Sequence, residues 1–599
     1  MRQLPDHRSS SAFIGELGWI FVVFALLHAV AAYILRAPLL DGGLIDTDSY
    51  MRLVRVTAFL NDGAWFDGTI SRSNAPFGEV LHWTRPLDIM LIALAAPFAA
   101  VLDWPAGLHV AALAIAPMAH LAGAVAMRWA VRPILDARGR LIAAFLYLSQ
   151  PAILSYSVAG RADHHAVLLA LFVVVLGFGL RIAEREEPGP LMPAVTLALG
   201  IWIAPEFLVP LALYVAVIAA SWILRGPDGV ARSVAFGGML VGLLAAAILI
   251  ERGPQDVLAV EFDRLSIAQF ALGLAVFGFL SGLRVASRFS ALSCGYESRA
   301  AVAAAIGVIG LAILLALFPQ LPRGPLAGLP ARIVTDFLDH VSEMQPLLGS
   351  RHLNATRAIQ FGAPAAVGAV YMAWRFWRAR AIAPGWLFLV LAGTVYAALT
   401  LQQVRWSGYL AILAAVALAD LTREAMRLLA RFGQARERLW GYGAIVPIAC
   451  LWPVYASATV DLVSPRSPTR GAAAANGGCS IAEAVRLPAL AGGPWTIWTE
   501  INTAPELLYR TPHRVIGTPY HRNTTGILDT IDAFKASDPE TAHRIATARG
   551  VDYMLFCRSD GESWRVKWLA DNSPPPAWLE PIALPAALEG RVLLFRIRR

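Results

Sequence analysis

The chain contains thirteen apolar runs close to the length of a helix that crosses a lipid bilayer, and these runs most constrain its fold. A bilayer-crossing helix needs about 20 predominantly apolar residues. The sequence therefore predicts a polytopic α-helical membrane protein with about 13 transmembrane helices, near residues 17–35, 106–127, 141–158, 164–180, 191–205, 207–224, 233–250, 267–283, 300–318, 359–374, 385–401, 406–420 and 440–458. A further apolar run, 87–102, is interpreted as a helix lying in the membrane interface and is not counted.

The composition excludes the main alternatives to a membrane fold. Of the 599 residues, 57% are hydrophobic and only 15% are charged, whereas soluble domains have about 25% charged residues. A soluble multidomain protein and a disordered or fibrous chain are therefore excluded. The formal net charge of +8 is attributed to arginine-rich cytoplasmic loops, where positive charge collects, and we expect no nucleic-acid partner.

The distribution of arginine predicts the topology. With a cytoplasmic N-terminus, every long internal loop carries several arginines, as the positive-inside rule requires. Thirteen spans then place the C-terminal tail outside, together with two large external loops, 36–105 and 319–358. We therefore predict a membrane domain over 1–460 and a soluble periplasmic α/β domain over 461–599, which begins with a linker at 464–478. The sequence leaves open whether Cys479 and Cys557, both in this domain, form a disulfide.

Acidic residues gather on the predicted outer face. Asp46 and Asp48 follow the first span, Asp163 precedes His164 and His165 at the outer end of the fourth span, and Glu343 lies in loop 319–358. Carboxylates near the membrane plane are costly unless they are paired, solvated or bound to metal. Three or four carboxylate oxygens with an imidazole suit a divalent cation such as Mg²⁺ or Mn²⁺. The alternative is that each acid acts alone, as a solvated loop residue, a surface glutamate or a helix N-cap.

Arg405 is the other informative charge. It lies at the predicted outer end of the twelfth span, directly before Trp406. Its guanidinium either extends to the membrane interface beside the indole or binds a phosphate headgroup, whose oxygens match the guanidinium fork. No nucleotide-binding or triad-hydrolase motif accompanies it.

Four segments resemble the catalytic subunit of oligosaccharyltransferase and its single-subunit bacterial and archaeal relatives, of the C-type glycosyltransferase (GT-C) superfamily. Asp46 stands six residues before Arg52, as in the first loop of that family. Residues 157–165 read Ser-Val-Ala-Gly-Arg-Ala-Asp-His-His, similar to the family's Ser-Val-Ala-Gly-x-x-Asp-Asn-Glu. Residues 340–346, His-Val-Ser-Glu-Met-Gln-Pro, resemble its Ser-Val-Ser-Glu-His-Gln-Pro, and Val404-Arg405 resembles a later Val-Arg motif. The family also has thirteen spans and an outer C-terminal domain.

The resemblance implies a set of roles. Asp46, Asp163 and Glu343 would be catalytic and, with His165, would bind Mn²⁺ or Mg²⁺ as a Lewis acid. Arg405 would bind the donor pyrophosphate. Transfer would invert the anomeric carbon, with a polyprenyl-diphosphate-linked glycan as donor and membrane lipids around the protein. The arginine-heavy, alanine-rich composition favours a bacterial inner membrane and hence an undecaprenyl lipid.

The departures from the family concern the acceptor. His165 replaces a glutamate, which favours Mn²⁺. The Trp-Trp-Asp-Tyr-Gly motif that recognises the hydroxyl of an Asn-x-Ser/Thr acceptor is missing; only Trp498, with Glu500 nearby, stands in a comparable place. We expect Asp48, Trp498 and Glu500 to contact the acceptor.

Three functions therefore stay open. The first is transfer of the glycan to protein asparagine, and the second is transfer to a hydroxyl of lipid, polysaccharide or Ser/Thr. The third is secondary transport, which would require ionisable residues at mid-bilayer and internal repeats.

Overall fold

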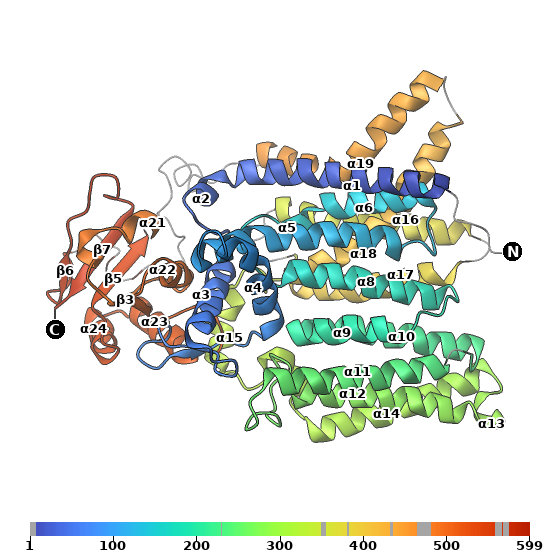
Figure 1. Ribbon diagram of the computed structural model, residues 1–599, viewed down its shortest axis with the longest axis horizontal. Helices are drawn as coiled ribbons and strands as arrows, with labels where there is room; N and C mark the ends of the chain where they lie inside the picture. Colours follow the sequence, from blue (N-terminus) through green and yellow to red (C-terminus); the bar gives the residue numbers. More distant parts are fainter. Residues whose placement is uncertain are drawn as a thin grey trace.

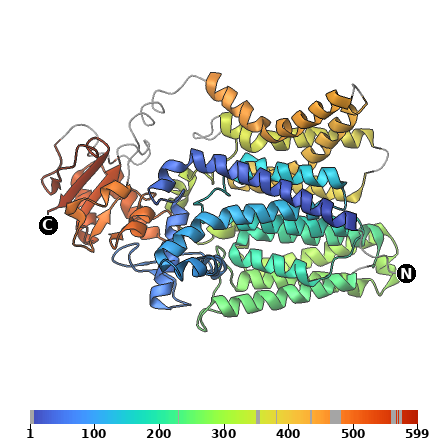
Figure 2. The ribbon, with the colours of Figure 1, turned by 45° about the horizontal axis from the view of Figure 1, so that its top comes forward.

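The computed structural model describes residues 7–228, 230–348, 355–379, 382–431, 435–463, 481–557, 566, 569 and 574–598. A bundle of long helices carries a smaller domain with a β-sheet at one end (Figure 1). The second view, turned about the horizontal axis, shows the same separation of bundle and domain (Figure 2). The domain belongs to the C-terminal part of the chain, as the sequence predicted.

Ten candidate spans in the described part of the chain are long and apolar enough to cross a membrane. Short 3-10 turns, Pro205–Phe207 and Val404–Trp406, extend the fourth and the ninth of these helices at their N-termini. The ten are α1 (His7–Ile34), α5 (Trp104–Ala130), α8 (His165–Ala183), α10 (Leu208–Arg225), α11 (Val230–Glu251), α12 (Ile267–Ala286), α14 (Tyr296–Leu317), α17 (Pro384–Gln402), α18 (Ser407–Leu429) and α19 (Ala435–Val463).

The other three predicted spans are also helical but differ from a simple span. The run 141–158 divides into α6 (Ala137–Ser149) and α7 (Pro151–Leu154). The break falls at Gln150, because helical backbone is disfavoured for a residue that precedes proline. The run 191–205 forms α9 (Leu191–Ile203), which has 13 residues. The run 359–374 lies in α16 (Ala355–Arg378), whose arginines give it a polar side. The uncounted run 87–102 forms α4 (Arg85–Ala99).

Small residues allow the bundle helices to pack closely. A Cβ atom added at Gly177 of α8 would lie 2.8 Å from the Cα atom of Ala130 of α5. Such close backbone approach is typical of helix packing in membranes. The innermost helix is α18, in which every residue from 407 to 420 is buried.

The C-terminal domain contains a five-stranded sheet in the order β4-β3-β5-β7-β6. Strands β3 (Thr496–Trp498), β4 (Arg514–Val515) and β5 (Tyr553–Cys557) are parallel, and β7 (Val592–Ile597) and β6 (Leu579–Pro581) continue the sheet antiparallel. The domain helices include α21 (Ile481–Ala484), α22 (Ala504–Arg510), α23 (Thr524–Lys535) and α24 (Pro539–Ala548). The predicted α/β fold is confirmed. Cys557 is disulfide-bonded; Cys479 lies outside the described residues.

Short elements connect the bundle to this domain. They are α2 (Arg36–Leu40), α3 (Thr47–Asp62), the hairpin of β1 (Thr69–Ile70) and β2 (Glu79–Val80), and α15 (Ala331–Asp336). The short helix α13 (Ser290–Ser293), between α12 and α14, lies at the other end of the bundle (Figure 1). The first external loop joins the domain directly: Val515 N donates to Arg72 O, and Ala75 N donates to Val515 O, both at 2.9 Å. The loop therefore hydrogen-bonds to the edge strand β4.

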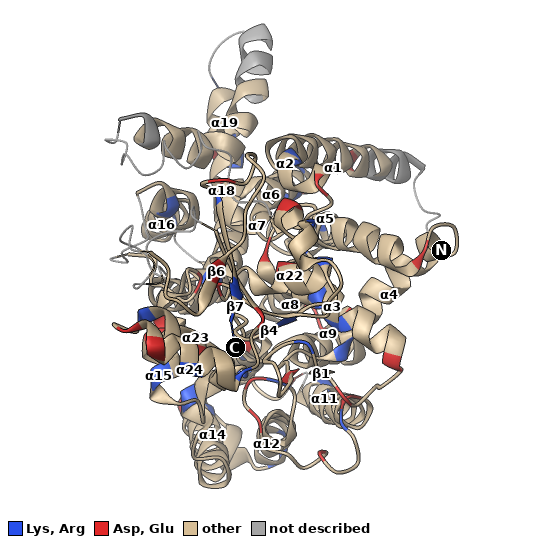
Figure 3. Ribbon diagram, turned by 90° about the vertical axis from the view of Figure 1, so that its left-hand side faces the viewer, with Lys and Arg blue, Asp and Glu red and all other residues tan. Residues whose placement is uncertain are grey.

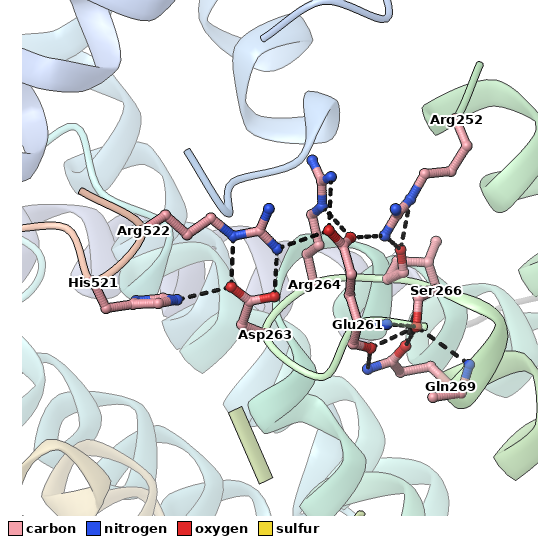
Figure 4. A network of polar contacts seen from close by, with 10 residues as sticks. Arg252, Glu261, Asp263, Arg264, Ser266, Gln269, His521 and Arg522 are labelled. Carbon is pink, nitrogen blue, oxygen red and sulfur yellow. Dashed lines mark hydrogen bonds and ion pairs between the residues drawn. The ribbon is translucent and has the colours of Figure 1, made fainter. Parts of the chain in front are cut away.

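A charged clamp provides a second connection (Figure 4). Asp263, in the loop between α11 and α12, accepts from Arg522 at 2.6 and 2.7 Å and pairs with His521 at 2.7 Å. Arg522 also pairs with Glu261 at 3.2 Å. The clamp fixes the segment between β4 and α23 against the end of the bundle.

Candidate active site

Asp46 caps the helix that enters the site. Its carboxylate accepts a hydrogen bond from Ser49 N at 2.8 Å at the start of α3, which is a common N-cap arrangement. The same carboxylate forms an ion pair with Arg161 at 2.9 Å. One carboxylate oxygen of Asp46 therefore caps α3 and the other pairs with Arg161, and its part in a metal site stays a prediction.

The carboxylate of Asp163 contacts both of the histidines that follow it in the sequence. One of its oxygens is 2.5 Å from His164 Nδ1, and the other pairs with His165 Nδ1. The N-cap position of α8 is taken by His164, without a side-chain hydrogen bond, so Asp163 does not cap this helix. His165 Nε2 is buried and lacks a hydrogen-bond partner within the described structure. An imidazole nitrogen left free in this way is available as a metal ligand.

The Glu343 loop is held by backbone hydrogen bonds. Arg405 N donates to Glu343 O at 3.1 Å, and Val404 N donates to Gln345 O at 2.8 Å. These bonds bring residues 319–348, the described part of the predicted loop 319–358 before α16, to the start of α18. Glu343 and Arg405, which are 62 positions apart in the sequence, therefore lie side by side.

Arg405 is paired in this structure with Glu206. Its guanidinium contacts one carboxylate oxygen of Glu206, and Tyr409 donates to the other at 2.8 Å. Glu206 lies in the 3-10 turn Pro205–Phe207 that precedes α10. Because Tyr409 and Arg405 both bind it, Glu206 orients the guanidinium at the edge of the acidic cluster.

The charges of the acidic residues in these segments act on one another. Burial raises the pKa of Asp48 well above its usual range, and the charges of Asp163, Asp46 and Glu343 raise it further. Burial also raises the pKa of Asp46, although Arg161 opposes this. Carboxylates raise one another's pKa when they lie close together. Asp46, Asp48, Asp163 and Glu343 therefore converge at the end of the bundle nearest the C-terminal domain.

The donor atoms fit a divalent cation. Within the described ranges, one group of acidic and histidine residues has ligand atoms all within 4.8 Å of one another: Asp163, His164 and His165. Burial alone would raise the pKa of Asp163, but the two histidines lower it well below its usual range. A carboxylate that stays ionised beside an unpaired buried imidazole nitrogen matches the mixed oxygen and nitrogen donors that Mn²⁺ accepts.

Trp498 and Glu500, the two acceptor-binding residues predicted in the tail, lie in different surroundings. Trp498 is completely buried in β3, and its indole nitrogen donates to Thr530 Oγ1 at 3.1 Å. This prediction is therefore wrong for Trp498, because no acceptor reaches a side chain enclosed in the domain core. Glu500 follows β3, and its carboxylate accepts from Thr503 Oγ1 at 3.3 Å.

Tyr520 reaches the site instead. It is buried, donates from its hydroxyl to Thr47 O at 3.2 Å, and hydrogen-bonds to Asp48. Figure 3 views the molecule from this end, with α3, α8 and α22 near the centre of the view. Tyr520 lies in an unusually basic and aromatic stretch, Tyr509–Asn523, which is a partial indication of its place at a site. The contact itself depends on how the domain docks.

No protein-family model and no curated protein matches this sequence. Solved structures do match its fold. The archaeal oligosaccharyltransferase AglB from Archaeoglobus fulgidus, in complex with an inhibitory peptide and a dolichol-phosphate, superimposes with a TM-score of 0.64 at 15% identity, over 90% of this chain and 69% of that chain.

Two further structures of the Archaeoglobus fulgidus enzyme match in the same way. One, in complex with Zn and sulfate, has a TM-score of 0.59 at 15% identity, over 89% of this chain and 68% of that chain. The other, tethered to an acceptor peptide that contains the NVT sequon, has a TM-score of 0.62 at 16% identity, over 90% and 69%. At this identity the likeness concerns the fold alone, and it confirms the predicted helical membrane bundle with a C-terminal α/β domain.

Proposed function

We propose that this protein is a membrane glycosyltransferase that transfers a glycan from a polyprenyl-diphosphate lipid to an acceptor, with protein asparagine as the first candidate. One observation carries the proposal. Asp46, Asp163, Glu343 and Arg405 come from four separate segments and converge at one end of a bundle with an oligosaccharyltransferase fold.

Each residue has a chemical role in this proposal. Asp163 and Nε2 of His165 would hold the divalent cation, with Asp46 and Glu343 completing the ligand set, and the cation would supply Lewis-acid stabilisation of the lipid pyrophosphate. Arg405 contacts the phosphate oxygens and stabilises the charge that develops on the leaving group. Asp48 and Glu343 accept hydrogen bonds from the acceptor group. The acceptor attacks the anomeric carbon from the face opposite the pyrophosphate, so the configuration inverts.

A hydroxyl acceptor is the second candidate. The burial of Trp498 favours it, because the tail then lacks the exposed indole that the family uses to recognise an Asn-x-Ser/Thr acceptor. Transfer to a lipid, a polysaccharide or a Ser/Thr side chain would use the same donor site. The two candidates differ only in the group that enters beside Asp48.

The arginine distribution supports a location for the site. The loops rich in arginine lie at the opposite end of the bundle from the acidic cluster, which fits a cytoplasmic inner face and a periplasmic active site. We propose a bacterial inner membrane and an undecaprenyl donor.

The test uses purified full-length protein, a lipid-linked glycan and an Asn-x-Thr peptide, with Mn²⁺ and then with EDTA. We expect peptide glycosylation that EDTA abolishes and that Asp46→Asn and Glu343→Gln reduce at least about a hundredfold. Glu540→Gln is the matched control, since that side chain is 75% exposed in α24.

The outcomes separate the candidates. Donor turnover without peptide glycosylation would favour the second candidate, a hydroxyl acceptor. Mass spectrometry of lipid and polysaccharide fractions would then identify that acceptor. Full activity of both acidic-site variants would refute the catalytic assignment.

A further inference from the structure

A cavity of about 360 Å³ lies at the end of the bundle away from the acidic cluster, where α16 ends, α17 begins and α18 approaches its last turns. Its lining combines aromatic and charged side chains, including Tyr371, Trp374, Arg375, Arg378, Trp386 and Glu424. A volume of this size accommodates a small polar group. The proposed transfer does not use this cavity.

One wall of the cavity is held by a buried carboxylate. Asp420 is completely buried and accepts from Tyr371 at 2.7 Å and from Arg375 and Arg423 at 2.5 Å each. The guanidinium of Arg375 also lies over the ring of Trp386, 4.6 Å from its centroid. Because Arg423 also pairs with Asp136 and Glu424, both at 3.3 Å, Asp420 mainly holds Arg375 and Tyr371 in a fixed orientation in the wall.

The mouth of the cavity carries an uncompensated cation. Arg378 is exposed and stacks over Trp374 at 5.3 Å, and no carboxylate in the described structure lies within ion-pair distance of it. The acid at the rim, Glu424, is already bound by Arg427 at 2.6 Å. An anion entering the cavity therefore meets two guanidinium groups and a neutralised glutamate.

Apolar surface continues from the mouth along two helices. Val367 and Val370 of α16 are 38% and 71% exposed, and Leu387 and Leu391 of α17 are 49% and 45% exposed. Trp377, 84% exposed, stands beside Arg378 in the sequence. Tryptophan and arginine side by side are typical of the level at which lipid headgroups meet the acyl chains.

We infer that this cavity binds the phosphate headgroup of an anionic phospholipid. Arg375 and Arg378 bind the phosphate oxygens through charge-assisted hydrogen bonds, and the acyl chains lie over the exposed valines and leucines of α16 and α17. Basic pockets between membrane helices are suited to such headgroups. The exposed apolar surface of α16 and α17 favours a lipid over a free phosphate ion, because only a lipid has acyl chains that can cover this surface.

The experiment measures binding to full-length protein in a neutral detergent and needs no enzymatic activity. Phosphatidylglycerol is titrated, with phosphatidylcholine and inorganic phosphate as separate arms, and melting temperature and native mass spectrometry report binding. We expect phosphatidylglycerol to raise the melting temperature and the other two probes to leave it unchanged. Arg378→Gln should weaken the apparent affinity about tenfold.

Two further variants complete the design. Arg132→Gln is the matched control, because Arg132 is an exposed arginine just after α5 at the same end of the bundle, and it should retain full binding. Trp374→Ala should weaken binding without a loss of charge. An unchanged affinity in Arg378→Gln would overturn the inference, and so would an equal effect of inorganic phosphate, which would indicate a soluble anion.

Discussion

Tyr520 of the C-terminal domain donates a hydrogen bond from its hydroxyl to the backbone carbonyl oxygen of Thr47, 3.2 Å away, between Asp46 and Asp48. Its ring meets Trp83 edge-on at 5.0 Å, and Arg52 lies 4.0 Å over the centroid of Trp83. The domain thus fixes the first turn of α3, which presents the two aspartates. A residue about 470 positions away in the sequence supports the acidic cluster.

Tyr520→Phe should lower the turnover of the proposed transfer while the protein stays folded. The variant keeps the ring and removes the hydrogen bonds to Thr47 and Asp48, at a cost of about 1 kcal/mol, which corresponds to about a fivefold lower kcat/KM. Steady-state kinetics with a circular-dichroism melt would measure both effects. Tyr33→Phe, at a side chain 66% exposed, is the control. Wild-type kinetics in Tyr520→Phe would show that the contact does not position the site.

Glu79→Gln should stabilise the protein at pH 8 and leave it unchanged at pH 4. Glu79 is buried at the junction of the first loop and the C-terminal domain, where it accepts from Ser73 at 2.5 Å and Thr518 at 2.6 Å. Burial raises its pKa to about 7. A carboxyl whose folded pKa is raised favours the folded state below its unfolded pKa, and this stability is lost as pH rises through the folded value.

Glu79→Gln removes this pH-dependent loss of folding stability, which amounts to about 3 kcal/mol above pH 7. Thermal melts of wild-type and variant protein at both pH values would measure it, with Glu540→Gln as control. Equal melting temperatures for wild type and Glu79→Gln at pH 8 would contradict the raised pKa.

Asp263→Asn should loosen the C-terminal domain from the bundle. Burial alone would raise the pKa of Asp263, but hydrogen bonds from His521 and Arg522 lower it far below its usual range. Its stabilisation is therefore present above the usual aspartate pKa of about 4 and decreases as pH falls below that value. Loss of charge-assisted hydrogen bonds should cost about 2 kcal/mol.

Hydrogen exchange of residues 520–524 would report the effect locally. The comparison is Asp532→Asn, since Asp532 forms an exposed ion pair with Arg332, and exposed pairs contribute little. Equal exchange in the two variants would mean that the clamp does not hold the domain.

His165→Gln should weaken Mn²⁺ binding at least about tenfold, because it removes the free imidazole nitrogen beside Asp163. Electron paramagnetic resonance titration of the protein would measure the metal directly, without an activity assay. His543→Gln, remote from the site in α24, should bind Mn²⁺ like the wild type. Retention of full affinity in His165→Gln would remove this residue from the proposed ligand set.

Hydropathy predicted the bundle well because a span leaves a strong local pattern. All thirteen predicted runs are mainly helical. The run 141–158 is interrupted for a local reason, because Pro151 follows Gln150. The burial of Trp498 was not predicted, because it depends on β3 lying between β4 and β5 in the sheet. The sequence also supplied Asp46, Asp163, Glu343 and Arg405 as candidates.

The pairings within the site depend on tertiary structure. The ion pair between Glu206 and Arg405 joins residues from two helices that are 199 positions apart, and nothing local to either residue indicates it. The contact of Tyr520 with Thr47 requires the domain to dock in a particular orientation. Sequence patterns record which side chains face inward, but they do not record which neighbours those side chains meet.

The two backbone hydrogen bonds from Val404 and Arg405 to the Glu343 loop have a kinetic consequence for the proposed function. The loop that carries the acid and the start of the helix that carries the guanidinium are joined through the main chain, so replacing either side chain leaves this connection intact. Each side chain of the pair can therefore be removed while its neighbour keeps its place, which makes the contributions of acid and guanidinium to turnover separable.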